Sequence, residues 1–378
     1  DFDFTEEQLM IRDAARYFAQ RELITDVIER DTGAIYPTRH VQRMAELGFL
    51  GMLVDVKYDG GGMDTVSYVL AMEEISKVDS SCSVIMSVNN SLVCYGLEAF
   101  GTEAQKEKYL KPLARGEKIG AFLLSEPNAG SDATSQKTIA TDMGDYYLVN
   151  GTKNWITNGN TAGTYLLIAQ THPEKMHKGI NCLIVDRNTP GIRVGPHEDK
   201  MGMRSSDTHS VMFTDVKVPK ENRIGDDGFG FTFAMKTLEG GRIGIAAQAL
   251  GIAAGAYERA LQYSKERKTF GTLISNHQAI AFKLADMAVK IENARNLCLK
   301  AAWLKDQGKP YGFASSMAKY YAAEMAMEVT TQAVQIHGGY GYVKDYHVER
   351  LMRDAKLTQI YEGTSEIQQM IISREILK

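Results

Sequence analysis

The spacing of apolar residues near the start of the chain predicts helices. Apolar residues from Ile11 to Phe18 recur at i, i+3, i+4 and i+7, which places them on one helical face. Thr5 and Gln8, just ahead of that face, have the spacing of a capping box, in which each side chain bonds the other residue's backbone N–H. Two further helices are expected at 66–78 and 83–100. The first part of the chain is therefore predicted to be helical.

The pattern changes to short β-type runs near Phe122 and keeps that character to about Asp226. Tyr147–Val149 leads into Asn150–Gly151, a dipeptide that favours a two-residue hairpin turn because both turn residues need a positive φ. Asn154–Thr157 is the expected return strand. Further strands are expected at 165–169, 181–185 and 211–213. We therefore expect a small antiparallel β-barrel or sandwich in the middle of the chain.

Helical spacing returns after the glycine-rich stretch 225–230, which is expected to be an interdomain loop. Apolar residues of 243–250 form one stripe. Ser275 and Gln278 repeat the capping-box spacing, and apolar residues of 280–298 then alternate by four and three, as in helix bundles. The predicted fold class is α+β and mostly α. Its domains are a helical domain at 1–120, an antiparallel β domain at 121–226 and a helical bundle domain at 227–378.

Composition narrows the class of protein. The 378 residues carry a net charge of −4 and the pI is about 6.1, so no nucleic-acid surface is expected. The four cysteines stand apart without a C-x-x-C pair, which predicts buried thiols in a reducing compartment rather than disulfides or a zinc site. The eight histidines show no metal-ligand spacing, so no metal is predicted. No secretory signal is visible in the first residues, and no run of 18 apolar residues predicts a membrane span.

Candidate chemistry lies in three segments, each of which also allows a simpler interpretation. The loop Ser125–Asp132 offers N–H groups and hydroxyls to a phosphate or a heterocycle, or it is a surface turn. Trp155 and Thr157 share one face of a strand and suit a stacked ring with a hydrogen-bonding nitrogen, or they pack as a cross-strand pair. Glu362 follows an apolar stretch that would raise its pKa and suit proton abstraction, or it is a capping or salt-bridged glutamate. Neither a Rossmann nor a P-loop glycine motif is present.

Five segments together resemble the acyl-CoA dehydrogenase family, and the resemblance covers essentially the whole chain. They are Leu124–Asp132 (LSEPNAGSD), Gly151–Asn158 (GTKNWITN), Glu266–Gly271 (ERKTFG), Gln335–Gly339 (QIHGG) and Ile360–Glu366 (IYEGTSE). The resemblance implies an N-terminal helical domain, a middle β domain and a C-terminal four-helix bundle. It also implies FAD bound without a covalent link, and a homotetramer built as a dimer of dimers.

The resemblance further implies positions for the cofactor and the substrate. Thr157 is expected to donate toward the flavin nitrogen that accepts hydride, and Arg267 to pair with the pyrophosphate of a neighbouring subunit's FAD. The acyl-CoA is expected at Ser131, Glu239, Arg242 and Gly363. FAD is expected at Phe122, Leu124, Ser125, Trp155, Ile156, Thr157, Arg267, Phe270, Gln278, Gln335, Gly338, Gly339, Thr364 and Glu366.

The implied activity is the α,β-dehydrogenation of a saturated acyl-CoA. Glu362 takes the α-proton, the β-hydrogen passes to the flavin as hydride, and a trans-2-enoyl-CoA is the product. In the family, the base residue's backbone N–H and a ribityl hydroxyl polarise the thioester carbonyl. The family's other base position corresponds to Gly241, which has no carboxylate. Glu239, two residues earlier, is expected on the helix surface and not as the base.

Val84–Leu92 and residues 240–246 resemble the short-chain, butyryl-CoA members of the family. The expected electron acceptor is an electron-transfer flavoprotein. The expected location is the bacterial cytoplasm, or the mitochondrial matrix for a processed eukaryotic chain, with no membrane partner. The alternatives are an acyl-CoA oxidase, a medium- or branched-chain dehydrogenase, a CoA lyase or hydratase, and a non-catalytic CoA- or flavin-binding protein.

Overall fold

The computed structural model describes residues 3–378, so the first two residues of the segment expected to lack a secretory signal lie outside it. The N-terminal part is helical, as predicted. The Thr5 hydroxyl accepts from the Gln8 backbone N–H, and the Gln8 side chain accepts from the Thr5 N–H, so the predicted capping box is confirmed. The helices are α1 (Glu6–Arg21), α2 (Val27–Gly33), α3 (Thr38–Glu46), α4 (Thr65–Ser76), α5 (Ser80–Ser87), α6 (Tyr95–Phe100), α7 (Glu103–Gln105) and α8 (Lys111–Ala114).

The helix predicted at 83–100 starts earlier and contains a π-helical segment. It starts at Ser80 because Asp79 accepts from the Cys82 backbone N–H and caps α5. Between α5 and α6 the backbone widens into the π-helical segment Val88–Cys94, in which every residue is buried. Wider turns of this kind are frequent at functional sites. Two of its residues, Ser91 and Leu92, face the long helix α9 (Gly230–Ser264).

Within the described residues, the middle of the chain forms an eight-stranded sheet in the order β6-β7-β3-β2-β4-β5-β8, with β1 beside β4. The strands β1 and β2 pair with β4 in parallel, which their long connections to β4 allow, and the other pairs are antiparallel. The sheet curls around one core of inward side chains, but the described end strands β6 and β8 do not pair with each other. The predicted antiparallel barrel or sandwich is thus an open, mixed sheet. Its strands are β1 (Gly120–Leu123), β2 (Ile139–Asp142), β3 (Tyr146–Thr157), β4 (Thr164–Gln170), β5 (Ile180–Asp186), β6 (Ile192–Val194), β7 (Thr208–Pro219) and β8 (Arg223–Ile224).

The hairpin predicted at Asn150–Gly151 is wrong. Residues 146–157 form the single strand β3, which pairs with β7. Gly151 lies at a bulge in that pairing, with a φ of +149°, and a Cβ there would lie 2.5 Å from the Thr138 hydroxyl oxygen. The Asn150 side chain donates to the Asp215 carboxylate at 3.1 Å and accepts from the Asp215 N–H at 2.9 Å. The same dipeptide suits a bulge as well as a turn, and the pairing with β7 selects the bulge.

The C-terminal part is helical again, and a small hairpin of β9 (Lys268–Thr269) and β10 (Thr272–Leu273) follows α9. The capping box predicted at Ser275 and Gln278 is wrong, because Ser275 lies in a 3-10 turn and His277 is the N-cap of the next helix, without a side-chain capping bond. The apolar seam predicted behind it is confirmed, since Leu284, Met287, Ile291, Ala294 and Cys298 are buried. The remaining helices are α10 (Gln278–Asp306), α11 (Gly312–His337), α12 (Val348–Thr358) and α13 (Ser365–Ile376).

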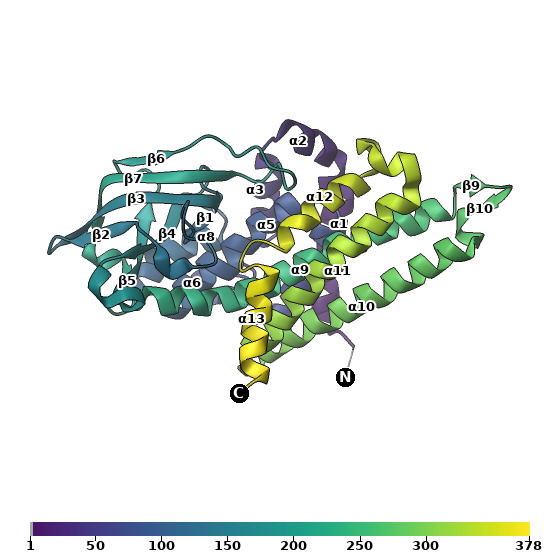
Figure 1. Ribbon diagram of the computed structural model, residues 1–378. Coiled ribbons are helices and arrows are strands. Elements are labelled where there is room, and N and C mark those ends of the chain that lie inside the picture. Colours follow the sequence, from purple (N-terminus) through teal and green to yellow (C-terminus); the bar gives the residue numbers. More distant parts are fainter. Residues whose placement is uncertain (1–2) are drawn as a thin grey trace.

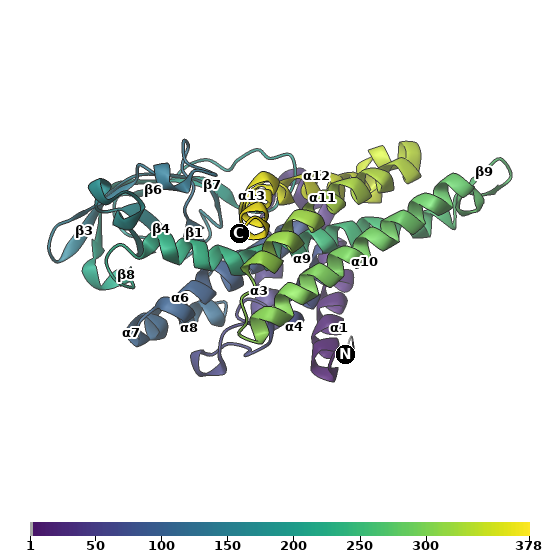
Figure 2. The same ribbon diagram turned by 60° about the horizontal axis from the view of Figure 1, so that its bottom comes forward.

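Helix α9 connects the sheet to the helical part. Its early residue Phe233 packs with Leu166 and Ile184 of the sheet in the larger of two hydrophobic cores, while later turns pack against α4 and α11. Figures 1 and 2 show the sheet at one end of the molecule and the β9–β10 hairpin at the other. The predicted mostly helical α+β class is confirmed. The domain boundaries near 120 and 226 stay a proposal, because the larger core crosses both. Among residues 3–378, no helix combines the length and the apolar character needed to cross a membrane.

Candidate active site

Glu362 lies in the short turn between α12 and α13. Its φ is +53°, a left-handed conformation that is uncommon for a residue with a side chain and persists only where surrounding contacts hold it. Both carboxylate oxygens are buried and accept no hydrogen bond from residues 3–378. The Glu362 backbone N–H likewise donates to no described group. The turn therefore presents a buried acid and a free N–H donor side by side.

Burial sets the protonation behaviour of Glu362. It raises the pKa of the carboxyl to about 7, and the nearby cations Lys319 and Arg242 act against that rise. Lys319 of α11 is fully buried, and its Nζ donates to the Gly363 carbonyl oxygen at 2.6 Å. Burial lowers the pKa of Lys319 to about 8. Arg242 of α9 is also buried, and its Nε has no partner within the described chain. A carboxyl with a pKa near 7 is suited to accept a proton at neutral pH.

Glycine forms the face of α9 that meets Glu362. A Cβ on Gly241 would lie 2.4 Å from Glu362 Oε2, so no larger side chain fits there while Glu362 keeps its place. The other nearby acid of α9, Glu239, is half-buried against α11 rather than on the helix surface as expected. A Cβ on Gly312 of α11 would lie 3.2 Å from the Glu239 carboxylate. Glu239 therefore points to α11, and Glu362 supplies the carboxylate opposite Gly241.

The loop after β1 is anchored beside the end of β3. The Asn154 backbone N–H donates to the Ser125 carbonyl oxygen at 2.9 Å. Lys153 is fully buried, donates to the Leu124 carbonyl oxygen at 2.9 Å and pairs with the buried Glu126 at 2.9 Å. Separating the two partners of a buried charge pair would leave each charge uncompensated, so the pair holds its two segments together. The structure thus brings the predicted positions 124 and 125 next to the predicted positions 155–157.

Trp155 and Thr157 share the outer side of β3, as predicted, because Ile156 between them is buried in the sheet core. Trp155 is 61% exposed and lies at a second bulge of β3, with a φ of +60°. An exposed indole held on a strained backbone offers a flat face to a ring system. Ile156 can approach a ligand there only through its backbone. Phe122 of β1 is half-buried nearby on the parallel strand beside β4.

A second group of predicted residues gathers near the β9–β10 hairpin. A pocket of about 530 Å³ is lined by Arg267, Gly338, Gly339 and Tyr340, among others. An added Cβ on either glycine would meet nothing within 4 Å, so the backbone there is open to a ligand. Three more predicted residues are exposed in this region, at the tip of the hairpin, the start of α10 and the end of α11: Phe270, Gln278 and Gln335.

These two groups lie far apart on one chain. Figures 1 and 2 place β1 and β3 at the opposite end of the molecule from β9. The other predicted positions lie on two segments: Ser131 is exposed on the loop after β1, while Thr364 caps α13 by accepting from the Ile367 N–H at 3.3 Å and Glu366 is exposed in the first turn of α13. The predicted cofactor residues therefore form separate groups on a single chain.

Sequence reasoning did not single out Lys319 or Gln248. Both are fully buried polar residues of helices, Lys319 on α11 and Gln248 on α9. A buried polar side chain needs partners, so a long polar residue among small and apolar helical neighbours was the available signal. The structure supplies those partners from the Glu362 turn. Lys319 bonds the Gly363 carbonyl oxygen, and Gln248 accepts from the Tyr361 hydroxyl.

Comparison with known proteins decides the family. The N-terminal, middle and C-terminal domains of acyl-CoA dehydrogenases match residues 5–117, 121–216 and 228–377. The chain belongs to the acyl-CoA dehydrogenase family. The resemblance inferred from five segments is thereby confirmed, as is the class of enzyme, an oxidoreductase. One relative in the family is an acyl-CoA dehydrogenase, short-chain specific, of Clostridium acetobutylicum, 50% identical over 378 residues that cover 100% of both chains.

Solved structures in the family agree with the fold. Butyryl-CoA dehydrogenase from Megasphaera elsdenii is 48% identical, with a TM-score of 0.98 over 100% of both chains. A chain solved in work on the electron transferring flavoprotein of Acidaminococcus fermentans is 51% identical, with a TM-score of 0.99 over 100% of both chains. The order of helical, β and helical parts is therefore the family's own.

Proposed function

We propose that this chain is a short-chain acyl-CoA dehydrogenase that uses FAD and converts a butyryl-CoA-like thioester to its trans-2-enoyl-CoA. The observation that carries the proposal is the Glu362 carboxylate, which is buried, lacks any hydrogen-bond partner among the described residues and lies opposite Gly241. The relative that is 50% identical and named short-chain specific supports the same substrate class.

Glu362 is the proposed base. With a pKa of about 7 it is substantially ionised at neutral pH, and burial leaves the ionised form poorly solvated and so more basic toward a carbon acid. Its own backbone N–H, free in the described chain, is proposed to donate to the thioester carbonyl oxygen and acidify the α-proton. One such donor contributes about 2.7–4 kcal/mol in comparable oxyanion sites. Arg242 and Lys319 balance the charge of the carboxylate before the proton arrives.

The residues present fit FAD in two places. The exposed Trp155, beside Thr157 and Ser125, suits the flavin ring, and FAD when bound supplies the acceptor for the β-hydrogen. The pocket with Arg267 and the open glycine backbone near Gly338 suits a pyrophosphate and an adenosine. Because the two places lie at opposite ends of one chain, we propose that each FAD is shared between two subunits of a homotetramer.

The depth of the acyl site is the basis for a short substrate. One turn after Gly241, a Cβ on Gly244 would lie 2.6 Å from Ser87 Oγ and 2.8 Å from the Tyr68 hydroxyl oxygen. Helices α9, α4 and α5 therefore meet closely just beyond Glu362, which leaves little room for a long acyl chain. Discrimination between neighbouring lengths is expected to be modest, about 1–3 kcal/mol per methylene in an apolar pocket.

Three further assignments belong to the same proposal. An electron-transfer flavoprotein is the proposed acceptor, supported by the chain 51% identical that was solved in work on such a flavoprotein. The CoA is proposed to run along Ser131, Glu239, Arg242 and Gly363, with Thr364 and Glu366 near FAD. The proposed location is the bacterial cytoplasm, or the mitochondrial matrix for a eukaryotic source.

The test is Glu362→Gln, which keeps the side-chain shape and removes the base. FAD content should match wild type, and turnover of butyryl-CoA should fall by about 10²–10⁴-fold, the usual contribution of a general base. Anaerobic flavin bleaching is followed with C4, C8 and C16 acyl-CoA. Near-normal turnover with FAD bound would overturn the base, and a C8 or C16 optimum would overturn the short-chain assignment. Glu375→Gln, at an exposed glutamate of α13, is the matched control.

A further inference from the structure

The residue just before Glu362 belongs to a polar network that the proposed chemistry does not use. The Tyr361 hydroxyl donates to Gln248 Oε1 of α9 and lies 3.9 Å from Met203 Sδ. Gln248 Nε2 donates to the Ser80 carbonyl oxygen at 3.0 Å and to Ser83 Oγ at 2.9 Å, both on α5. Tyr361 is thereby tied to two helices that are distant from it in sequence.

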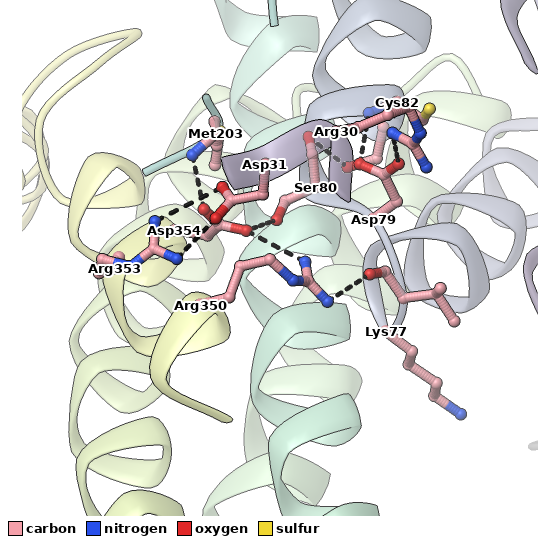
Figure 3. Close-up of polar contacts among 12 residues, drawn as sticks. Arg30, Asp31, Lys77, Asp79, Ser80, Cys82, Met203, Arg350, Arg353 and Asp354 are labelled. Carbon is pink, nitrogen blue, oxygen red and sulfur yellow. Dashed lines mark hydrogen bonds and ion pairs between the residues drawn. The ribbon is translucent and has the colours of Figure 1, made fainter. Parts of the chain in front are cut away.

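Asp354 of α12 completes the network. One of its oxygens accepts from Ser80 Oγ at 2.5 Å, and the other accepts from the Met203 backbone N–H at 2.5 Å. Figure 3 shows Asp354 between these two donors, with Arg350 approaching it from the same helix. The contacts close on themselves, because Met203 also reaches Tyr361. We call the set Tyr361, Gln248, Ser80, Asp354 and Met203 the Tyr361 network.

The Tyr361 network joins distant parts of the chain at one point. Ser80 comes from the N-terminal helices, Met203 from the connection before β7, and the other three from the C-terminal helices and the Glu362 turn. Ser80, Met203, Gln248 and Asp354 are each at most 2% exposed. Buried hydrogen bonds in such a low-dielectric setting are strong, and leaving one unmade is costly. The Tyr361 network therefore has little freedom to shift.

Two residues with a strained backbone lie in or next to the Tyr361 network. Met203 has a φ of +46° and Glu362, next to Tyr361, has a φ of +53°, both in the left-handed region. Conformations of this kind cost free energy and persist only where surrounding structure over-determines them. No hydrogen bond from the described chain holds the Glu362 carboxylate itself. Its position depends on the backbone, which Tyr361 holds on one side and the Lys319 bond to Gly363 holds on the other.

We infer that the Tyr361 network positions Glu362: it holds the turn in its left-handed conformation so that the carboxylate faces the substrate's α-carbon without a hydrogen bond of its own. The inference rests on the proposed role of Glu362 as the base. On this inference Tyr361, Gln248, Ser80, Asp354 and Met203 are positioning residues that act through Glu362.

The test is Tyr361→Phe in the FAD-loaded oligomer, which removes only the hydroxyl. A displacement of the Glu362 carboxylate by about 1 Å lowers turnover by up to about 100-fold. The kcat for butyryl-CoA should therefore fall while KM changes little. Backbone amides of 359–363 should exchange hydrogen faster than in wild type. Wider excursions expose the Glu362 carboxylate to water, so the acidic limb of the kcat/KM profile should move to lower pH.

The pH readout involves the groups that face Glu362 from each packed element. They are Lys319 of α11, Arg242 of α9, Tyr68 of α4 and Tyr361 itself. Tyr361→Phe leaves the two cations in place, so a shift of the acidic limb reports the freedom of the carboxylate. Tyr147→Phe is the matched control, because Tyr147 is also buried and its hydroxyl accepts a bond from Arg223 at 3.0 Å within the sheet. That variant should keep wild-type kcat, limb and exchange at 359–363.

The outcomes separate the two proposals. Tyr361→Phe could keep the wild-type kcat, acidic limb of the kcat/KM profile and amide exchange at 359–363 while Glu362→Gln is inactive. That result would overturn the positioning role of the Tyr361 network and leave the base assignment intact. Wild-type turnover in Glu362→Gln would overturn the base itself. If Tyr361→Phe fails to fold, Ser80→Ala decides, because it breaks only the bond to Asp354 and leaves the Ser80 carbonyl for Gln248. The same three readouts should move in the same directions, and unchanged values there would refute the inference.

Discussion

Replacing Glu362 by glutamine should stabilise the protein in a pH-dependent way. The wild-type carboxyl is buried without a hydrogen bond from the described chain, and its pKa rises from 4.5 to about 7. Below pH 4.5 the group is protonated in both the folded and the unfolded chain, so it has no effect on their balance. Between these two values the unfolded chain ionises first, so the wild type loses stability as the pH rises, and glutamine does not. The stability difference between the variant and the wild type should therefore grow with pH.

The magnitude follows from the pKa. Each pKa unit corresponds to about 1.4 kcal/mol, so a rise from 4.5 to about 7 amounts to about 3 kcal/mol once the group is fully ionised. Roughly 2.5 kcal/mol of this falls between about pH 5 and pH 8. Lys319 and Arg242 already lower this pKa, so their attraction is contained in the figure. For 378 residues unfolding together, about 0.8 kcal/mol/K of unfolding entropy converts the change to a melting shift of about 3 °C.

The assay compares melting temperatures of wild type and Glu362→Gln as FAD-loaded oligomers, at fixed protein and flavin concentration, from about pH 5 to pH 8. Any cost of burying the glutamine amide is independent of pH, so the slope of the difference isolates the carboxylate. Glu375→Gln, at an exposed side chain, should show no such slope. A difference that stays flat across this range, or that shrinks as the pH rises, would refute the claim that Glu362 is a desolvated acid.

Three further changes test other parts of the structure. Gly241→Ala places a methyl 2.4 Å from Glu362 Oε2 and must displace the carboxylate, so kcat should fall by about 100-fold at normal FAD content, and wild-type kcat would contradict this geometry. Lys153→Met leaves the buried Glu126 without its cation and should lower stability by about 3–5 kcal/mol, whereas the exposed Lys217→Met should not, as a denaturant titration will show. Arg267→Ala should weaken FAD by about 10- to 100-fold through loss of a charge-assisted contact, measured by flavin fluorescence against the exposed Lys265→Ala; equal affinities would remove Arg267 from the FAD site.

The elements that the sequence predicted well depend on local spacing. The capping box at Thr5 and Gln8 and the seam of α10 from Leu284 to Cys298 were predictable because a helix brings residues three and four apart to one side. The long strand β3 was predicted only in part. Asn150–Gly151 carries a strong local turn signal, but its outcome depended on β7, whose paired residues lie about sixty positions further along the chain.

The candidate site shows the same division. A glutamate in a turn between two helices, with glycine after it, could be named from the segment Ile360–Glu366 and its resemblance to a family. The sequence could not show that Gly241 would leave that carboxylate its space, that Lys319 would bond the next residue, or that Asp354, Ser80 and Met203 would meet behind Tyr361. Local backbone preferences are written in neighbouring residues. The pKa of Glu362 and its strained φ come instead from desolvation and contacts among helices separated by up to hundreds of residues, which only packing brings together.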